Sequence, residues 1–218
     1  MPKNLDLNEN LEQYIINHSE NLHPIQKELI EENNKLGEIK RMQISISQAH
    51  FFQMIIKIAK IKNILEIGTF TGFSALSMTL ALPKDGKLIT LDKDKKTSFI
   101  AQGFFKKANL HNMIEQIINP ALETISDLKK NNKIFDLIFI DADKENYKNY
   151  YENSLEILKK DGLLIIDNTL WRGNVADELK KDKFVDIMRE FNIYIKKDNR
   201  IENVILPLGD GLTVCVKR

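Results

Sequence analysis

Short apolar runs alternate with longer amphipathic segments over most of the chain. The apolar runs have the length of strands and occupy residues 63–67, 87–92, 113–118, 134–141 and 162–167. The segments between them are predicted as helices over residues 73–81, 95–108, 121–130 and 144–158. Strands that are apolar throughout are typical of a parallel sheet covered on both faces. The alternation therefore predicts an α/β fold with a doubly wound, mostly parallel sheet.

The N-terminal part of the chain is more polar than the rest and is helix-prone. Apolar and aromatic residues recur at helical spacing from Leu11, and Pro24 begins a second helical segment that ends before Gly37. We expect a helical cap over residues 1–45, which acts as a cover of the sheet, as a lid or as part of a dimer contact. Residues 46–218 then form the core of a single domain that spans residues 1–218.

Two further amphipathic helices are predicted outside the alternating part. The helix over residues 47–60 carries an apolar face at i, i+3, i+4 and i+7, formed by Phe51, Met54, Ile55 and Ile58. The helix over residues 177–191 has the same spacing, formed by Phe184, Ile187, Met188 and Phe191.

The chain ends with two strand-like runs, residues 203–206 and 212–217. Only the five residues PLGDG separate them, which is too short for a crossover between parallel strands. The short connection predicts a hairpin, so one antiparallel strand ends the otherwise parallel sheet.

Composition and charge narrow the functional classes. The chain has 218 residues, of which 43% are hydrophobic and 29% charged, as is usual for a globular protein. A net charge of +1 gives no support to an extended contact with nucleic acid or with an anionic membrane. The single cysteine, Cys215, excludes an internal disulfide and a cysteine cluster for zinc. No apolar run approaches the ~20 residues of a membrane span, and we expect a cytoplasmic protein.

The sequence NILEIGTFTGFS (63–74) is predicted as a strand, a glycine-bounded turn and the start of a helix, which is the usual ligand cradle of an open α/β sheet. Phe70 stands where a dinucleotide-binding loop has its second glycine, and the loop contains no Lys or Arg to meet a pyrophosphate. Glu66 beside the loop repels phosphate and suits a cationic amino group. S-adenosylmethionine, a nucleoside with an amino-acid tail and a positive sulfonium, fits this loop better than NAD.

Asp92 follows the second predicted strand, twenty residues after Gly72. A carboxylate at this place can accept both hydroxyls of a ribose. The alternative interpretation is an N-cap for the helix that begins near Lys95.

Polar residues follow two later strands of the predicted sheet. Asp141 ends the run FDLIFID (135–141), and Asp167 and Asn168 end the run LIIDN (164–168). Two carboxylates and an amide oxygen form an oxygen-only ligand set, which suits Mg²⁺, Mn²⁺ or Ca²⁺ rather than zinc. The alternative is that these side chains only cap the helices that follow.

Two residues near this predicted cation site can take part in the chemistry. A cation close to Lys144 would make its ammonium group lose a proton more readily. The neutral amine that results is a candidate base. The alternative is a solvated surface lysine. Trp171, the only tryptophan, is predicted either to wall an aromatic substrate or to pack within its loop.

Taken together, these motifs resemble the cation-dependent class I O-methyltransferases, the group that contains caffeoyl-CoA O-methyltransferase and, more distantly, catechol O-methyltransferase. The resemblance covers nearly the whole chain. It is carried by the blocks MQIS (42–45), LEIGTFTGFS (65–74), NPALET (119–124), IDADK (140–144), DNTLW (167–171) and LPLGDGL (206–212).

The resemblance implies a Rossmann-like sheet of seven strands with the last strand antiparallel, and a homodimer. It implies that S-adenosylmethionine is contacted by Ile44, Glu66, Gly68, Thr69, Ser74, Asp92, Ala121 and Asp141. It also implies that Asp141, Asp167 and Asn168 hold the divalent cation, with Mg²⁺ as the first choice, and that Lys144 acts together with Asp141 in catalysis. Trp171 and Arg172 would contact the substrate, and Arg172 stands where plant members have an Asn.

The predicted reaction is methyl transfer from S-adenosylmethionine to a hydroxyl of a vicinal diol on a small aromatic molecule. Both diol oxygens would chelate the cation, which lowers the pKa of the attacking hydroxyl, and Lys144 would accept its proton. Three alternatives stay open at this point. They are O-methylation of a hydroxylated nucleoside in tRNA, a nicotinamide-dependent oxidoreductase, and a non-catalytic binding domain on the same scaffold.

Overall fold

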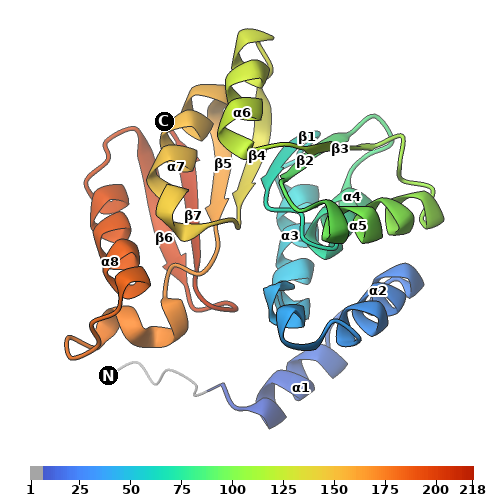
Figure 1. The fold of residues 1–218 in the computed structure, drawn as a ribbon, viewed down its shortest axis with the longest axis horizontal. Coiled ribbons are helices and arrows are strands. Elements are labelled where there is room, and N and C mark those ends of the chain that lie inside the picture. Colours follow the sequence, from blue (N-terminus) through green and yellow to red (C-terminus); the bar gives the residue numbers. More distant parts are fainter. Residues whose placement is uncertain (1–6) are drawn as a thin grey trace.

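The computed structural model describes residues 7–218, which form a seven-stranded sheet with helices on both faces (Figure 1). The strands are β1 (Asn63–Ile67), β2 (Lys87–Asp92), β3 (Ile114–Ile118), β4 (Phe135–Ile140), β5 (Leu158–Ile166), β6 (Ile201–Leu206) and β7 (Leu212–Lys217). The α-helices are α1 (Glu9–Asn17), α2 (Pro24–Asn34), α3 (Ile46–Ile58), α4 (Phe73–Ala81), α5 (Lys95–Lys107), α6 (Ala121–Lys130), α7 (Tyr147–Ile157) and α8 (Lys183–Lys196). Three short 3₁₀ helices are η1 (Gly37–Met42), η2 (Lys144–Asn146) and η3 (Trp171–Ala176).

The order of the strands in the sheet is β3-β2-β1-β4-β5-β7-β6. The pairs from β3 to β5 are parallel, whereas β7 is antiparallel to both β5 and β6. The predicted α/β sheet with an antiparallel last strand and a C-terminal hairpin is therefore confirmed. The chain builds outward from β1 to β3 and then returns to the other side of β1 with β4. Open α/β sheets bind ligands at such a reversal of strand order, outside the carboxyl ends of the strands.

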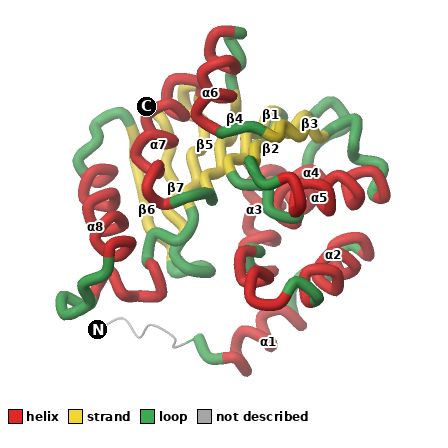
Figure 2. Tube along the Cα trace, in the orientation of Figure 1, coloured by secondary structure: helices red, strands yellow, loops and turns green. Residues whose placement is uncertain are grey.

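The apolar strands separate two hydrophobic cores, one on each face of the sheet. On β1, Leu65 and Ile67 pack with residues of α6, α7 and α8, while Ile64 packs with residues of α2, α3, α4 and α5. All three side chains are fully buried. Figure 2 shows the helices arranged on both sides of the sheet. Burial on both faces explains why these strands are continuous apolar runs without a polar alternation.

Three predicted boundaries differ from the structure. The helix predicted over residues 177–191 begins only at Lys183, because the Asp182 side chain accepts a hydrogen bond from the Phe184 N–H and caps the helix. The strand predicted over residues 162–167 begins earlier, at Leu158, and its pairing with β4 shifts register at an irregularity. The helix predicted over residues 144–158 opens with the separate 3₁₀ turn η2.

Helix α3 buries a face that its apolar spacing marks only in part. The buried residues are Gln48, Ala49, Phe52 and Ile56. Of the predicted apolar face, Phe51 and Ile55 are partly buried and pack against the core, whereas Met54 and Ile58 are 58% and 70% exposed. Helix α3 therefore presents large apolar side chains outward.

The N-terminal helices attach to the sheet to different extents. Helix α1 buries none of its residues, whereas α2 places Ile25 and Leu29 in the core shared by α3 and α4. The division of the chain into a cap over residues 1–45 and a core over residues 46–218 stays a prediction. Within residues 7–218, no helix combines the length and the apolar character that a membrane crossing requires.

Candidate functional site

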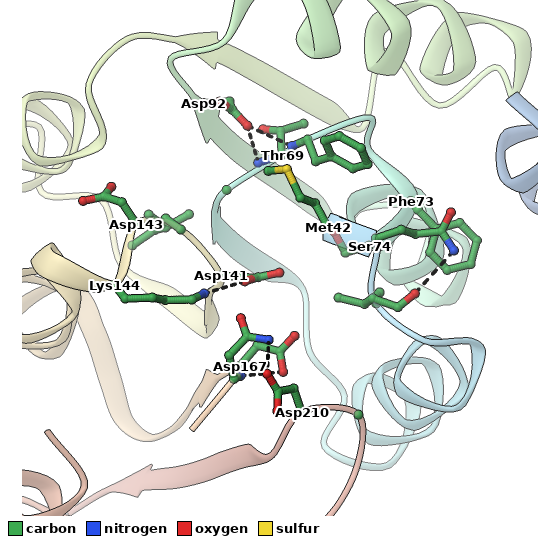
Figure 3. Close-up of a pocket in the computed structure, with 18 of the residues that line it drawn as sticks. Met42, Thr69, Phe73, Ser74, Asp92, Asp141, Asp143, Lys144, Asp167 and Asp210 are labelled. Atoms are coloured by element: carbon green, nitrogen blue, oxygen red, sulfur yellow. Dashed lines mark hydrogen bonds and ion pairs between the residues drawn. The ribbon is translucent and has the colours of Figure 1, made fainter. Parts of the chain in front are cut away.

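A cavity of about 920 Å³ lies outside the carboxyl ends of β1, β2, β4 and β5 (Figure 3). Its volume is near the upper end of the usual range for ligand pockets, about 300–1,000 Å³. Twelve residues singled out from the sequence line it, namely Ile44, Gly68, Thr69, Ser74, Asp92, Ala121, Asp141, Lys144, Asp167, Asn168, Trp171 and Arg172. The fold thus brings together segments that are far apart in the sequence.

The glycine turn after β1 forms one wall of the cavity. Gly68 has a φ of +107°, and a Cβ at this position would lie 1.8 Å from the backbone oxygen of Asp141. Only a residue without a side chain lets the two backbones approach this closely. Gly68 therefore sets the distance between the turn and the end of β4, where the predicted catalytic residues begin.

Asp92 fixes the conformation of this turn. Its Oδ2 atom accepts hydrogen bonds from the backbone N–H groups of Thr69 (3.0 Å) and Phe70 (2.8 Å). Its Oδ1 atom accepts one from the Asp94 N–H (2.9 Å). Asp94, not Asp92, caps α5, because its side chain accepts from the Lys96 and Thr97 N–H groups. The N-cap interpretation of Asp92 is therefore wrong, and its predicted role toward a ribose stays a prediction.

Glu66 lies beneath the turn and is not part of the cavity lining. The Thr90 hydroxyl donates to its Oε2 atom (2.5 Å), while its buried Oε1 atom has no hydrogen-bond partner. Complete burial raises the pKa of Glu66 to about 8. An unpartnered carboxylate oxygen at this depth fits a ligand that brings a hydrogen-bond donor or a positive charge. Its predicted contact with S-adenosylmethionine stays a prediction.

The three predicted cation ligands stand at the ends of two neighbouring strands. Asp141 follows β4, and Asp167 and Asn168 follow β5, with Ile140 and Ile166 paired across the two strands. Burial, followed by the negative charge of Asp141, raises the pKa of Asp167 well above its usual range. Two close carboxylates in a buried place favour a bound positive charge.

The donor set also fits a hard cation. Among residues 7–218, no three His, Cys, Asp or Glu side chains cluster in a way that could hold a metal ion, so any third protein ligand beside Asp141 and Asp167 would have to be of another residue type. Asn168 lines the same cavity and offers an amide oxygen. Oxygen ligands of this kind suit Mg²⁺, Mn²⁺ or Ca²⁺.

Lys144 points into the cavity from the turn η2 (Figure 3). Its Nζ atom lies 3.1 Å from Asp141 Oδ1 and also contacts the Tyr147 hydroxyl. The Lys144 side chain is only 12% exposed, so it is not the solvated surface lysine of the alternative interpretation. Burial raises the pKa of Tyr147 well above its usual range, so its phenol stays neutral and serves as a hydrogen-bonding partner.

Trp171 and Arg172 form the side of the cavity next to Asn168. Both have left-handed backbone conformations, with φ values of 45° and 57°, and the Arg172 N–H donates to Asp210 Oδ1. The Trp171 ring packs against Phe184, with ring centroids 5.7 Å apart. Trp171 therefore packs within the protein and also lines the cavity, and its predicted contact with an aromatic substrate stays a prediction.

Several lining residues were not singled out from the sequence, and three of them make side-chain hydrogen bonds at the cavity. Gln48 on α3 donates to Asp167 Oδ1, Asp210 lies next to Asn168 and Arg172, and Asp143 accepts a hydrogen bond from the Tyr150 hydroxyl. The pattern S-x-x-Q (45–48) is typical of a capping box and indicates only that a helix starts after Ser45. Nothing local marked the contact of Gln48 with a residue 119 positions away.

Comparisons with known proteins identify the family of the chain. The family model described as O-methyltransferase matches residues 16–218. Caffeoyl-CoA O-methyltransferase 1 from Zea mays is 36% identical over 228 residues, covering 98% of this chain and 86% of the relative.

Solved structures of methyltransferases are also similar to this chain. An O-methyltransferase from Bacillus cereus, in complex with SAH (S-adenosylhomocysteine), has a TM-score of 0.88 and 28% identity over 96% of this chain and 97% of its own. An SAH-bound methyltransferase from Podospora anserina has a TM-score of 0.90 and 25% identity, with full coverage of both chains. The chain therefore belongs to the O-methyltransferase family and is an S-adenosylmethionine-dependent O-methyltransferase.

Proposed function

We propose that this enzyme methylates one hydroxyl of a vicinal diol on a small aromatic molecule and that it requires a divalent cation. The observation that carries the proposal is the meeting of Asp141, Asp167, Asn168 and Lys144 in the cavity that also contains the glycine turn. The caffeoyl-CoA O-methyltransferases to which the chain is similar act, as their name says, on a caffeoyl compound. A catechol-like acceptor is in keeping with that similarity.

Asp141, Asp167 and Asn168 are the residues that would hold the cation. When bound, a divalent cation lowers the pKa of a hydroxyl that it coordinates and so makes that oxygen a better nucleophile near neutral pH. Burial and the repulsion between the two carboxylates make two negative charges unfavourable in this site. A bound cation would relieve both effects, which favours its binding.

Lys144 is proposed as the base that accepts the proton of the attacking hydroxyl. Its Nζ atom is held by Asp141 Oδ1 and the Tyr147 hydroxyl, which fixes the position of the nitrogen at the cavity, and in its neutral amine form this nitrogen can take up the proton. General bases in such positions contribute typically about 10²- to 10⁴-fold to a rate. The deprotonated oxygen then attacks the methyl carbon, and the bond from that carbon to the departing sulfur breaks.

The glycine turn and its neighbours are proposed to seat S-adenosylmethionine. Thr69, Ser74 and Ala121 line the cavity from the segments after β1 and β3, and Ile44 lines it from the segment between η1 and α3. Asp92 Oδ2 already accepts two backbone N–H groups and Oδ1 accepts one, so the lone pair that remains on Oδ1 is the one proposed to accept a ribose hydroxyl. Holding donor and acceptor in one cavity supplies much of the acceleration in a methyl transfer of this kind.

The test is a methylation screen with S-adenosylmethionine as donor. Catechols, hydroxycinnamoyl thioesters and unmodified tRNA are offered as acceptors, each with Mg²⁺ and with a chelator. Methylation of diols that disappears with chelator supports the proposal, and a matched monophenol should stay unmethylated. Methylation of tRNA alone would favour the nucleoside alternative, to which the exposed Arg172 and the lysine-rich residues 180–183 could contribute.

We further propose that the protein forms a homodimer. The proposal is supported by the apolar side chains that α3 leaves outward, with Met54 58% and Ile58 70% exposed. Analytical ultracentrifugation of the wild type and of a Met54→Lys, Ile58→Lys variant tests it. A wild type that stays monomeric at micromolar concentration would contradict self-association.

A further inference from the structure

Gln48 links the start of α3 to one of the two carboxylates of the proposed cation site. Its Nε2 atom donates a hydrogen bond to Asp167 Oδ1 over 2.9 Å, and both side chains are buried, with exposures of 2% and 4%. A contact between two buried polar side chains is stronger and better defined than one on the surface. Gln48 and Asp167 therefore hold each other in one geometry.

The hydrogen bonds of Asp167 distinguish its two carboxylate oxygens. Oδ1 accepts from Gln48 Nε2 and from the backbone N–H of Asn168 at 2.7 Å. Among the described residues, no hydrogen bond reaches Oδ2. A carboxylate oxygen has two lone pairs in the plane of the group. Oδ1 is therefore committed to the protein, and Oδ2 is the oxygen available to a ligand in the cavity.

Gln48 is itself fixed so that only its NH₂ group can face Asp167. Its Oε1 atom accepts a hydrogen bond from the backbone N–H of Ser45 (2.9 Å), while the Ser45 hydroxyl accepts from the Gln48 N–H (3.2 Å). This capping box turns the amide nitrogen away from the helix start. On the other side, a Cβ at Gly209 would lie 2.4 Å from Gln48 Oε1, so the absence of a side chain at Gly209 leaves room for the amide.

We propose that Gln48 is a positioning residue of the cation site, which selects Oδ2 of Asp167 as the metal-binding oxygen by occupying Oδ1. This inference rests on the proposed cation dependence. Without the hydrogen bond from Gln48, the Asp167 carboxylate can rotate. Fixing it again when the cation binds would cost free energy, which weakens cation binding. Hydrogen-bonding partners of metal ligands typically change metal affinity by about 10- to 100-fold when they are removed.

The test measures Mn²⁺ affinity of the purified full-length protein by electron paramagnetic resonance, which needs no turnover. Gln48→Met keeps the length of the side chain and removes both hydrogen-bonding groups. Gln48→Asn keeps the amide, but the loss of one methylene withdraws it by about 1.5 Å. We expect both variants to bind Mn²⁺ about 10- to 100-fold more weakly than the wild type.

Gln26 offers a matched control. It is also a buried capping-box glutamine, 1% exposed, whose Oε1 accepts from the His23 N–H and whose Nε2 donates to the Ser77 hydroxyl, away from the cavity. Gln26→Met should lower the melting temperature to a similar extent as Gln48→Met and leave Mn²⁺ affinity within twofold of the wild type.

The outcomes separate this inference from the one on which it rests. A wild type without Mn²⁺ binding overturns both. A wild type that binds Mn²⁺, with Gln48→Asn equal to it, overturns the positioning role alone. An equal loss of Mn²⁺ affinity in the Gln26→Met protein would show that general loosening of the fold causes the effect and would also overturn that role. If Gln48→Met does not fold, Gln48→Asn decides the question.

Discussion

Replacing Asp92 by alanine is expected to destabilise the turn after β1. Asp92 Oδ2 accepts hydrogen bonds from the backbone N–H groups of Thr69 and Phe70. Both residues are buried, with exposures of 1% and 8%. Each buried donor left without a partner costs about 1–3 kcal/mol, so the two together cost about 2–6 kcal/mol. Water that enters from the adjoining cavity satisfies part of this loss, which places the expected value at about 2–4 kcal/mol.

Urea unfolding and thermal melting measure this effect. For a chain of this length, a loss of 2–4 kcal/mol corresponds to a fall in melting temperature of roughly 4–16 °C. Asp92→Asn is the matched variant, because its amide oxygen can still accept from both Thr69 and Phe70. Its NH₂ group, however, then meets the Asp94 N–H and offers no acceptor to a ribose. We expect this variant to lose only about 1 kcal/mol of stability.

Calorimetric titration with S-adenosylhomocysteine separates the two roles of Asp92. The loss of a ribose acceptor in Asp92→Asn should weaken binding by about tenfold or more, equivalent to about 1.4 kcal/mol. An Asp92→Ala protein as stable as the wild type would refute the argument from buried donors. An Asp92→Asn protein that binds as tightly as the wild type would refute the ribose role and leave the role in the turn intact.

Three further substitutions test other parts of the site. Lys144→Ala should keep affinity for S-adenosylhomocysteine and cut turnover by about 10²- to 10⁴-fold, and unchanged turnover would remove Lys144 from the mechanism. In the folded chain the pKa of Glu66 is about 8, above its ordinary value of 4.5. Between these two pH values the Glu66 carboxyl is therefore protonated in the folded chain and ionised in the unfolded chain. Stability without cofactor should therefore fall as pH rises from about 5 to about 8, and Glu66→Gln should flatten this slope in urea unfolding; an equal slope in both proteins speaks against the burial argument. Gly68→Ala places a Cβ 1.8 Å from the Asp141 backbone oxygen, so we expect loss of stability and of S-adenosylhomocysteine binding, and a variant that binds normally would contradict the close approach.

The sheet could be predicted because its signals are local. Apolar runs such as β1, β2 and β4 are buried on both faces, and the five-residue connection between β6 and β7 permits only a hairpin. The first residue of a helix is harder to predict, because apolar spacing does not show which residue caps the helix. Asp182 caps α8 five residues after the predicted start of that helix at Asp177.

The candidate site was predictable as far as it follows the strand ends. Asp141, Asp167 and Asn168 come directly after apolar runs, and the carboxyl ends of parallel strands meet at one edge of the sheet. Gln48 and Asp210 reach the site through contacts between segments far apart in the sequence, which no local pattern indicates. The buried face of α3 was only partly predictable, because its regular apolar spacing also includes Met54 and Ile58, which the structure leaves exposed.

The central claim is that Asp141, Asp167 and Asn168 hold a cation that the methyl transfer needs. The most direct measurement is transfer of a labelled methyl group from S-adenosylmethionine to a catechol, with Mg²⁺, with chelator, and with chelator followed by excess Mg²⁺. The account predicts transfer with Mg²⁺, loss of transfer with chelator, and recovery when the cation is restored. Transfer at an equal rate with chelator present would contradict it.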